Sequence, residues 1–267
     1  MKKPVIAIVG LTCCEGCRVA ITDLGARILD LAQKVVIGDF SFIKEHPTEE
    51  QFDIAFIEGT PFLNVEHIVY LKKLRDRTKF LVAIGACACQ GGIQKIKNYR
   101  DKIEVAKYVY GGTPWSQGQS PDNIENLDIK PISGYVKVDL EIPGCPINKE
   151  EFLVLVQKLL AGWTHIKIPQ RPVCYECQIR QNPCLLQEGK PCMGPIMLGG
   201  CNAPCPSSGW ACDGCRGPIS EVHTGENLRK ILQSQGLDEN SINMILERYG
   251  ERDQLEDIEI KQKKIKK

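Results

Sequence analysis

The sequence predicts an α/β fold in which a doubly wound parallel sheet is followed by a loop-rich, cysteine-rich domain. Two observations lead to this prediction. Up to about residue 161, short apolar runs alternate with stretches of helical periodicity. Beyond Arg171 this periodicity stops, and eight of the fourteen cysteines fall between Cys174 and Cys215, among glycines and prolines. Such a segment is not expected to build an apolar core of its own, so other bonds must hold it together.

The expected strands of the first part are short, continuous apolar runs, which are typical of strands buried on both faces. These runs are residues 5–9, 35–37, 54–57 and 80–84. Residues 136–142 instead alternate apolar and charged side chains, which predicts a strand with one wetter face at the edge of the sheet. The general class is therefore flavodoxin-like.

Helical periodicity fills the spaces between these runs. A helix after the first strand places Ala20, Leu24, Ile28 and Leu31 on one face, and further helices are expected over residues 65–77, 149–160, 226–233 and 239–249. Three domains are predicted. Residues 1–165 form the flavodoxin-like domain, residues 166–220 the cysteine-rich domain, and residues 221–267 the C-terminal helices and a basic tail.

Composition excludes several classes of protein. The formal net charge is +1, so neither nucleic acid nor a membrane surface is expected as a partner. No apolar run approaches transmembrane length. Fourteen cysteines could form a secreted disulfide framework, but the sequence begins with no convincing signal peptide. In a reducing compartment, dense cysteine indicates metal or redox chemistry.

Four cysteines follow the ends of expected strands. Cys14 and Cys17 lie in the turn after residues 5–9, Cys87 follows residues 80–84, and Cys145 follows the last strand. The carboxyl ends of parallel strands meet at one edge of a sheet, so these four thiols, here called the first thiol group, are expected to converge. Four convergent thiolates are what a [4Fe–4S] cluster requires.

The remaining ligand candidates form two sets of four, each containing a C-x-x-C pair. The second thiol group is Cys174, Cys177, Cys184 and Cys192, and the third thiol group is Cys201, Cys205, Cys212 and Cys215. On spacing alone, iron–sulfur clusters and structural zinc are equally compatible with these sets. The first thiol group favours iron–sulfur, because zinc sites usually use compact knuckles rather than thiols spread over several strand ends.

Two further cysteines and two glutamates lie in or beside the same strand-end turns. Cys13 and Cys89 are expected to be small buried hydrophobes, although Cys13 could replace Cys14 as a ligand. Glu15 and Glu58 lie in the strand-end turns, where capping of amides or hydrogen bonding at an interface is favoured over proton relay or partner binding. No dinucleotide fingerprint, phosphate-binding loop, Ser-His-Asp set or paired carboxylates are present, so no catalytic residue is predicted.

Taken in order, these motifs resemble the small subunit of [NiFe] hydrogenases, most closely the cytoplasmic archaeal sulfhydrogenase delta-subunit type. The first thiol group alone also matches the quinone-reductase subunit of respiratory complex I, so the eight later cysteines make the resemblance specific. It is carried by Cys14-Glu15-Gly16-Cys17, Gly85-Ala86-Cys87-Ala88, Gly91-Gly92, Pro143-Gly144-Cys145-Pro146, Cys192-Met193-Gly194-Pro195 and Cys212-Asp213-Gly214-Cys215.

The resemblance implies three [4Fe–4S] clusters: a proximal one on the first thiol group, a distal one on the second, and a medial one on the third. Periplasmic uptake enzymes carry His in place of Cys174 and Pro in place of the fourth medial cysteine. The four-cysteine sets here therefore favour three [4Fe–4S] clusters. The nickel–iron site would lie in a separate large subunit.

The partners implied by the resemblance are this large subunit and electron-transfer subunits that bind iron–sulfur clusters and a flavin or NAD(P). The sequence has no twin-arginine leader and no membrane tail, so a cytoplasmic enzyme is expected. Three alternatives remain open. They are the small subunit of an F420-reducing or heterodisulfide-reductase-linked hydrogenase, a structural zinc-binding interaction protein, and a complex-I-like subunit that would leave eight cysteines without a role.

Overall fold

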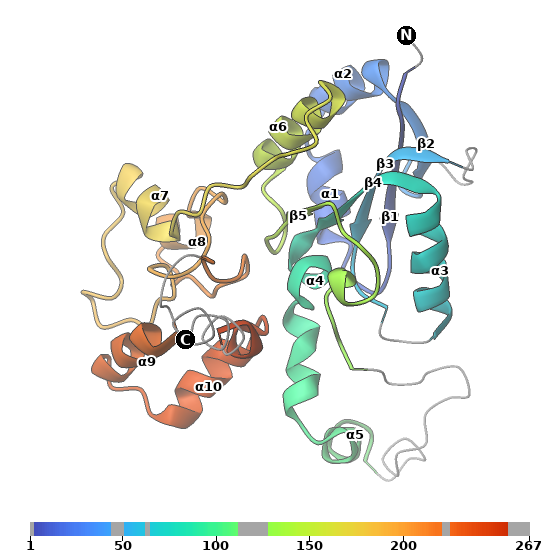
Figure 1. Cartoon of the computed structure of the whole chain (residues 1–267). Coiled ribbons are helices and arrows are strands. Elements are labelled where there is room, and N and C mark those ends of the chain that lie inside the picture. The colour runs from blue at the N-terminus through green and yellow to red at the C-terminus, as the bar shows by residue number, and fades with distance from the viewer. Residues whose placement is uncertain (1–2, 44–50, 62–64, 112–127, 221–224, 256–267) are drawn as a thin grey trace, which may run out of the picture. The chain divides into compact units, whose positions relative to one another are not determined.

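The computed structural model describes residues 3–43, 51–61, 65–111, 128–220 and 225–255. The chain divides into two compact units, Met1–Gly162 and Trp163–Lys267, each described here by itself (Figure 1). The three predicted domains remain a prediction, and the basic tail lies outside the described residues. Among the described residues, none of the helices is both long enough and apolar enough to cross a membrane.

The first unit is built on a five-stranded sheet in the order β2-β1-β3-β4-β5. Every neighbouring pair of strands is parallel. This is the flavodoxin-like order, so the predicted fold class is confirmed. The strands are β1 (Val5–Gly10), β2 (Val36–Phe40), β3 (Phe52–Glu58), β4 (Thr78–Ile84) and β5 (Leu140–Ile142).

The register of the sheet brings four strand ends to one level. Gly10 of β1 is opposite Glu58 of β3, and Glu58 is opposite Ile84 of β4. Ile84 is in turn opposite Ile142, the last residue of β5. The turns that follow these four residues therefore leave the sheet along the same carboxyl edge.

Helices cover both faces of this sheet (Figure 1). Leu71 and Leu74 of α3 belong to one buried cluster with Ala55 and Ile57 of β3. Phe56, the residue between those two, faces the other side and meets Phe152 of α6 with ring centroids 5.0 Å apart. The helices are α1 (Gly16–Thr22), α2 (Ala26–Lys34), α3 (Val65–Asp76), α4 (Gly85–Gln90), α5 (Lys102–Tyr110) and α6 (Lys149–Leu160), with 3-10 helices η1 (Ile93–Tyr99) and η3 (Ile132–Gly134).

Two predicted elements of this unit differ from the structure. The single helix expected after β1 is interrupted between α1 and α2, where Gly25 has a φ of 60°. The last strand is shorter than the predicted residues 136–142. At Asp139 the side chain, rather than the backbone oxygen, accepts a hydrogen bond from the backbone of β4. Its carboxylate accepts the Leu81 amide at 2.8 Å, and Arg75 donates to the same carboxylate at 2.6 Å. Val136 and Val138 pack on the buried cluster without joining the sheet.

The second unit contains α7 (Val173–Ile179), α8 (Pro204–Ser207), α9 (Gly225–Ser234) and α10 (Glu239–Glu247). The cysteine-rich segment shares its apolar core with the C-terminal helices and does not build one alone, which agrees with the expectation from sequence. Met193 and Met197 of this segment are buried in one cluster with residues of α9 and α10. The apolar faces of these two helices supply the area that the segment lacks. The other buried members are Val173, Ile196, Ala203, Leu228, Leu232, Ile242, Leu246 and Leu255.

Candidate metal centres

The first thiol group lies along the carboxyl edge of the sheet, in the turns after β1, β4 and β5. Burial, together with the neighbouring Cys145 and Cys14 thiols, raises the pKa of the Cys87 thiol to about 12. Burial also raises the pKa of Cys17, with smaller contributions from Glu58 and Cys87. Cys14, Cys17 and Cys145 therefore each lie within electrostatic range of Cys87.

Two glycines make room for these sulfurs. Gly85 has a φ of +84°, and a Cβ atom there would overlap the Cys17 Sγ. Gly92 has a φ of +66°, and its Cβ would lie 2.7 Å from the Cys87 Sγ. Side chains larger than hydrogen are therefore excluded at both positions by backbone conformation and by space. The two glycines and the neighbouring thiols together form a glycine cradle, in which the absence of side chains leaves room for a bulky inorganic group.

Glu58 holds the turn that carries Cys14 and Cys17 in place. Its Oε1 accepts the Cys17 amide at 3.0 Å, its Oε2 accepts the Arg18 amide at 3.2 Å, and only 2 % of the residue is exposed. The Arg18 Nε lies 3.5 Å from the Glu58 Oε2, while the Arg18 Nη2 donates to the Glu15 Oε1 at 2.6 Å. Capping of amides, the favoured interpretation of Glu58, is confirmed. Glu15 instead forms an ion pair.

The two cysteines outside the groups point to backbone carbonyls. The Cys13 Sγ donates to the Leu11 oxygen at 3.4 Å, and the Cys89 Sγ donates to the Ala83 oxygen at 3.5 Å. Both are half-buried rather than fully buried. Cys89 packs against the apolar cluster of the sheet, whereas Cys13 lies near enough to Cys87 to influence its pKa.

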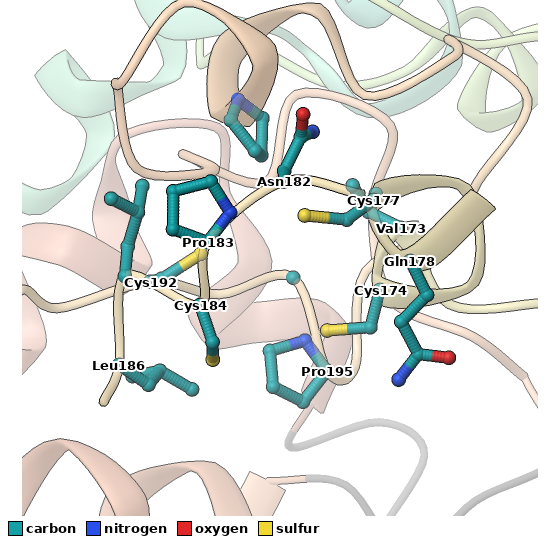
Figure 2. Close-up of a pocket in the computed structure, with 13 residues that line it drawn as sticks. Val173, Cys174, Cys177, Gln178, Asn182, Pro183, Cys184, Leu186, Cys192 and Pro195 are labelled. Atoms are coloured by element: carbon teal, nitrogen blue, oxygen red, sulfur yellow. The ribbon is translucent and has the colours of Figure 1, made fainter. Parts of the chain in front are cut away.

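The second thiol group lines a single cavity of about 90 Å³ in the second unit. Figure 2 shows Cys174 and Cys177 entering it from α7, with Cys184 and Cys192 on the loop beyond. A cavity needs only about 10–15 Å³ to hold one water. This space therefore suits a group of several atoms. Burial, together with the other three thiols of the group, raises the pKa of Cys174 to about 11.

The third thiol group adjoins the second. Burial raises the pKa of Cys212 well above its ordinary value, and the charges of Cys192, Cys215 and Cys201 also raise it. The Cys212 amide donates to the Cys192 Sγ at 3.3 Å, so the two groups share a hydrogen bond. Burial and the nearby Asp213 raise the pKa of Cys205. The sequence offered no signal for the contact between Cys192 and Cys212.

Sulfur is the donor common to all three groups. Among the described residues, no three or more His, Cys, Asp or Glu side chains are grouped to hold a single metal ion. Four sulfurs around one tetrahedral zinc at 2.3 Å would be about 3.8 Å apart, whereas cluster ligands bind different irons and lie farther apart. Thiol-only donors, the glycine cradle and the large cavity fit an iron–sulfur cluster.

A flavodoxin-like sheet with thiols along its carboxyl edge, followed by a cysteine-rich unit, defines a class of oxidoreductase subunits. Residues 14–159 match the family described as NADH ubiquinone oxidoreductase, 20 Kd subunit. Sulfhydrogenase 2 subunit delta of Pyrococcus furiosus is 35% identical, over 86% of this chain and 94% of that protein. One subunit of the F420-non-reducing hydrogenase of Methanothermobacter thermautotrophicus is 30% identical, over 83% of this chain and 80% of that protein.

Among solved structures, a chain of an NAD+-reducing [NiFe]-hydrogenase in the H2-reduced state aligns with a TM-score of 0.53. It is 28% identical, and the alignment covers 63% of this chain and 97% of that one. The chain therefore belongs to the NADH ubiquinone oxidoreductase 20 Kd subunit family, as a member of the hydrogenase small-subunit type.

Proposed function

We propose that this protein is the electron-transfer small subunit of a soluble, cytoplasmic [NiFe] hydrogenase. It passes electrons between a nickel–iron site in a separate large subunit and a partner that binds a flavin or NAD(P). The observation that carries this proposal is the convergence of the first thiol group, whose members come from turns after three different strands. Four thiols at this edge are the donor set that a [4Fe–4S] cluster requires.

The ligand sets of the proposal follow the three thiol groups. The first would hold the proximal [4Fe–4S] cluster, the second the distal cluster and the third the medial cluster. When bound, each cluster accepts and releases one electron at a time. The cavity lined by the second group and its four sulfur donors support a cluster rather than a single ion.

The chain's own residues contribute position and environment. Glu58 holds the amides of Cys17 and Arg18 and so fixes the turn that carries the first cysteine pair. The Ala86 amide donates to the Gly144 oxygen at 2.7 Å, which ties the turn of Cys87 to the turn of Cys145. Among the proposed ligands, Cys17 and Cys192 are buried, and burial around a ligand limits the access of water and helps to set the potential of its cluster.

The electron acceptor is proposed from two relatives. The aligned structure is of an NAD+-reducing enzyme, and the relative from Pyrococcus furiosus is a sulfhydrogenase subunit. A second candidate partner is favoured by the relative from Methanothermobacter thermautotrophicus, whose enzyme is F420-non-reducing. A disulfide reductase would then take the place of the flavin/NAD(P) subunit.

Purification of the native complex under anaerobic conditions tests the proposal. We expect a nickel-containing large subunit and a flavin-containing subunit to co-purify with this chain. Hydrogen should then bleach the iron–sulfur absorbance of the complex and reduce NADP+. A complex without nickel, or absorbance that hydrogen leaves unchanged, would refute the proposed function. Co-purification of a disulfide reductase in place of the flavin subunit would instead select the second candidate.

A further inference from the structure

The loop that carries Cys201 is held by a carboxylate from another part of the second unit. The Oε1 of Glu176, on α7, accepts the Gly200 amide at 2.5 Å, and its Oε2 accepts the Ala203 amide at 3.2 Å. The same Oε2 lies 3.8 Å from the Cys201 Sγ. Glu176 stands between two members of the second thiol group in sequence, yet its carboxylate serves the third.

A buried cation holds the other side of this loop. The Arg216 Nε donates to the Gly199 oxygen at 2.9 Å, and only 4 % of the residue is exposed. Arg216 directly follows the last cysteine of the third thiol group. A negative and a positive side chain therefore bind the backbone of one ligand loop, with Cys201 between them.

The loop needs such support because its backbone is unfavourable. Asn202 and Ala203 both adopt left-handed conformations, with φ of 65° and 47°. Neither is glycine, and for Ala203 the Cβ atom makes this conformation costly. The hydrogen bonds from the loop amides to Glu176 hold this conformation in place. The loop is shaped by its side-chain partners rather than by its own preferences.

The two charges act on the Cys201 sulfur in opposite directions. The Glu176 Oε2 lies 3.8 Å from the Cys201 Sγ, and the Arg216 Nε donates to the oxygen of Gly199, two residues before Cys201. A cluster bound through this sulfur would feel both charges, because each reduction adds one negative charge near them. The carboxylate would disfavour reduction and the guanidinium would favour it.

We propose that Glu176 and Arg216 are positioning residues that set the reduction potential of the cluster on the third thiol group in opposite directions. This inference rests on the proposed function, since it requires a cluster at that group. It adds two residues outside the cysteine motifs to the electron-transfer machinery. It also predicts that the effects of the two charges oppose each other.

The test is a redox titration of the anaerobically purified complex, followed by EPR spectroscopy. The signal of the third group is the one that Cys205→Ser alters. Glu176→Gln should raise its midpoint potential, and Arg216→Gln should lower it. Each change should correspond to about a tenfold change in the equilibrium constant, or about 59 mV for one electron. The double variant should have a potential between those of the two single variants.

Two surface substitutions are matched controls. Glu239 and Arg229 form an exposed ion pair between α10 and α9, so Glu239→Gln and Arg229→Gln remove the same charges elsewhere in the unit. Both should leave all potentials unchanged. Arg216→Lys keeps the charge and should also keep the potential. If Glu176→Gln fails to assemble the cluster, the comparison of Arg216→Gln with Arg216→Lys still decides the question.

The outcomes are distinct. Opposite shifts that offset each other in the double variant support the inference, as does a fall in Arg216→Gln that Arg216→Lys does not share. Unchanged potentials, shifts in the same direction, or equal shifts in both Arg216 variants overturn it while leaving the proposed function intact. A wild-type complex without iron–sulfur signals would overturn the proposed function and this inference with it.

Discussion

Replacing Glu58 by glutamine tests how the sheet positions the first thiol group. The carboxylate accepts the amides of Cys17 and Arg18 and lies beside the Arg18 guanidinium, with 2 % exposure. Glutamine keeps one oxygen acceptor and replaces the other by an NH2 group that faces donors. The change therefore removes at least one charge-assisted hydrogen bond inside the protein.

The size of the effect follows from these contacts. A hydrogen bond to a charged group contributes about 1.5–3 kcal/mol, and a buried charge left without its partner adds to the cost. We expect local opening of the turn at Cys17 to become easier by about 3 kcal/mol, or roughly a hundredfold. The Glu15 carboxylate still pairs with Arg18, which limits the loss.

Hydrogen exchange of the Cys17 and Arg18 amides in the metal-free chain measures this opening directly. Glu150→Gln is the matched control, because Glu150 forms an exposed ion pair with Arg27 at 2.6 Å. The control should leave both amides protected as in the wild type. The reasoning is refuted if Glu58→Gln changes their exchange no more than Glu150→Gln does.

Three further predictions concern the same unit. Cys87→Ala should lower the iron content by about four per chain and abolish hydrogen-dependent carrier reduction, while Cys89→Ala, in the same short helix, should preserve both. Gly92→Ala, whose Cβ would lie 2.7 Å from the Cys87 Sγ, should alter the EPR signal of the first group. Asp139→Asn should accelerate exchange of the Leu81 amide that its carboxylate accepts, as measured by mass spectrometry.

The last of these predictions has a defined pH dependence. Although burial opposes it, hydrogen bonds from Leu81 and Arg75 hold the pKa of Asp139 below its ordinary value. The stabilisation is therefore complete above the ordinary aspartate pKa of about 3.9 and declines as the pH falls through the lower folded value. Protection of Leu81 should decline on acidification in the wild type and not in Asp139→Asn. Retained activity in Cys87→Ala, an unchanged signal in Gly92→Ala, or a flat acid profile would contradict the respective prediction.

Much of the fold could be predicted because buried parallel strands are nearly continuous apolar runs. Residues 54–57 and 80–84 lie inside β3 and β4 as expected. The predicted edge strand, residues 136–142, is longer than the observed one. The alternation of apolar and charged residues correctly indicates that Val136 and Val138 are partly buried, but it does not indicate whether their backbone pairs with the sheet. Only the tertiary structure shows that the Asp139 side chain takes the place of a ladder partner.

The thiols of the candidate sites could be located from their spacing in the sequence. The carboxylates that hold the thiol-bearing loops in place could not. Glu58 and Cys17 are far apart in sequence and meet only because β1 and β3 are neighbours in register. Glu176 lies within a C-x-x-C pair, where spacing alone assigns it no role. Its carboxylate binds the loop of a different thiol group, and this depends on how the chain folds back after α7.

Metal and sulfide analysis of the anaerobically purified native protein tests the central claim most directly. Three [4Fe–4S] clusters require about twelve iron and twelve acid-labile sulfide per chain, together with a brown absorbance. We expect these values, with iron falling when any one thiol group is removed. A colourless protein that contains stoichiometric zinc and no sulfide would contradict the account, because no electron could then pass through this chain.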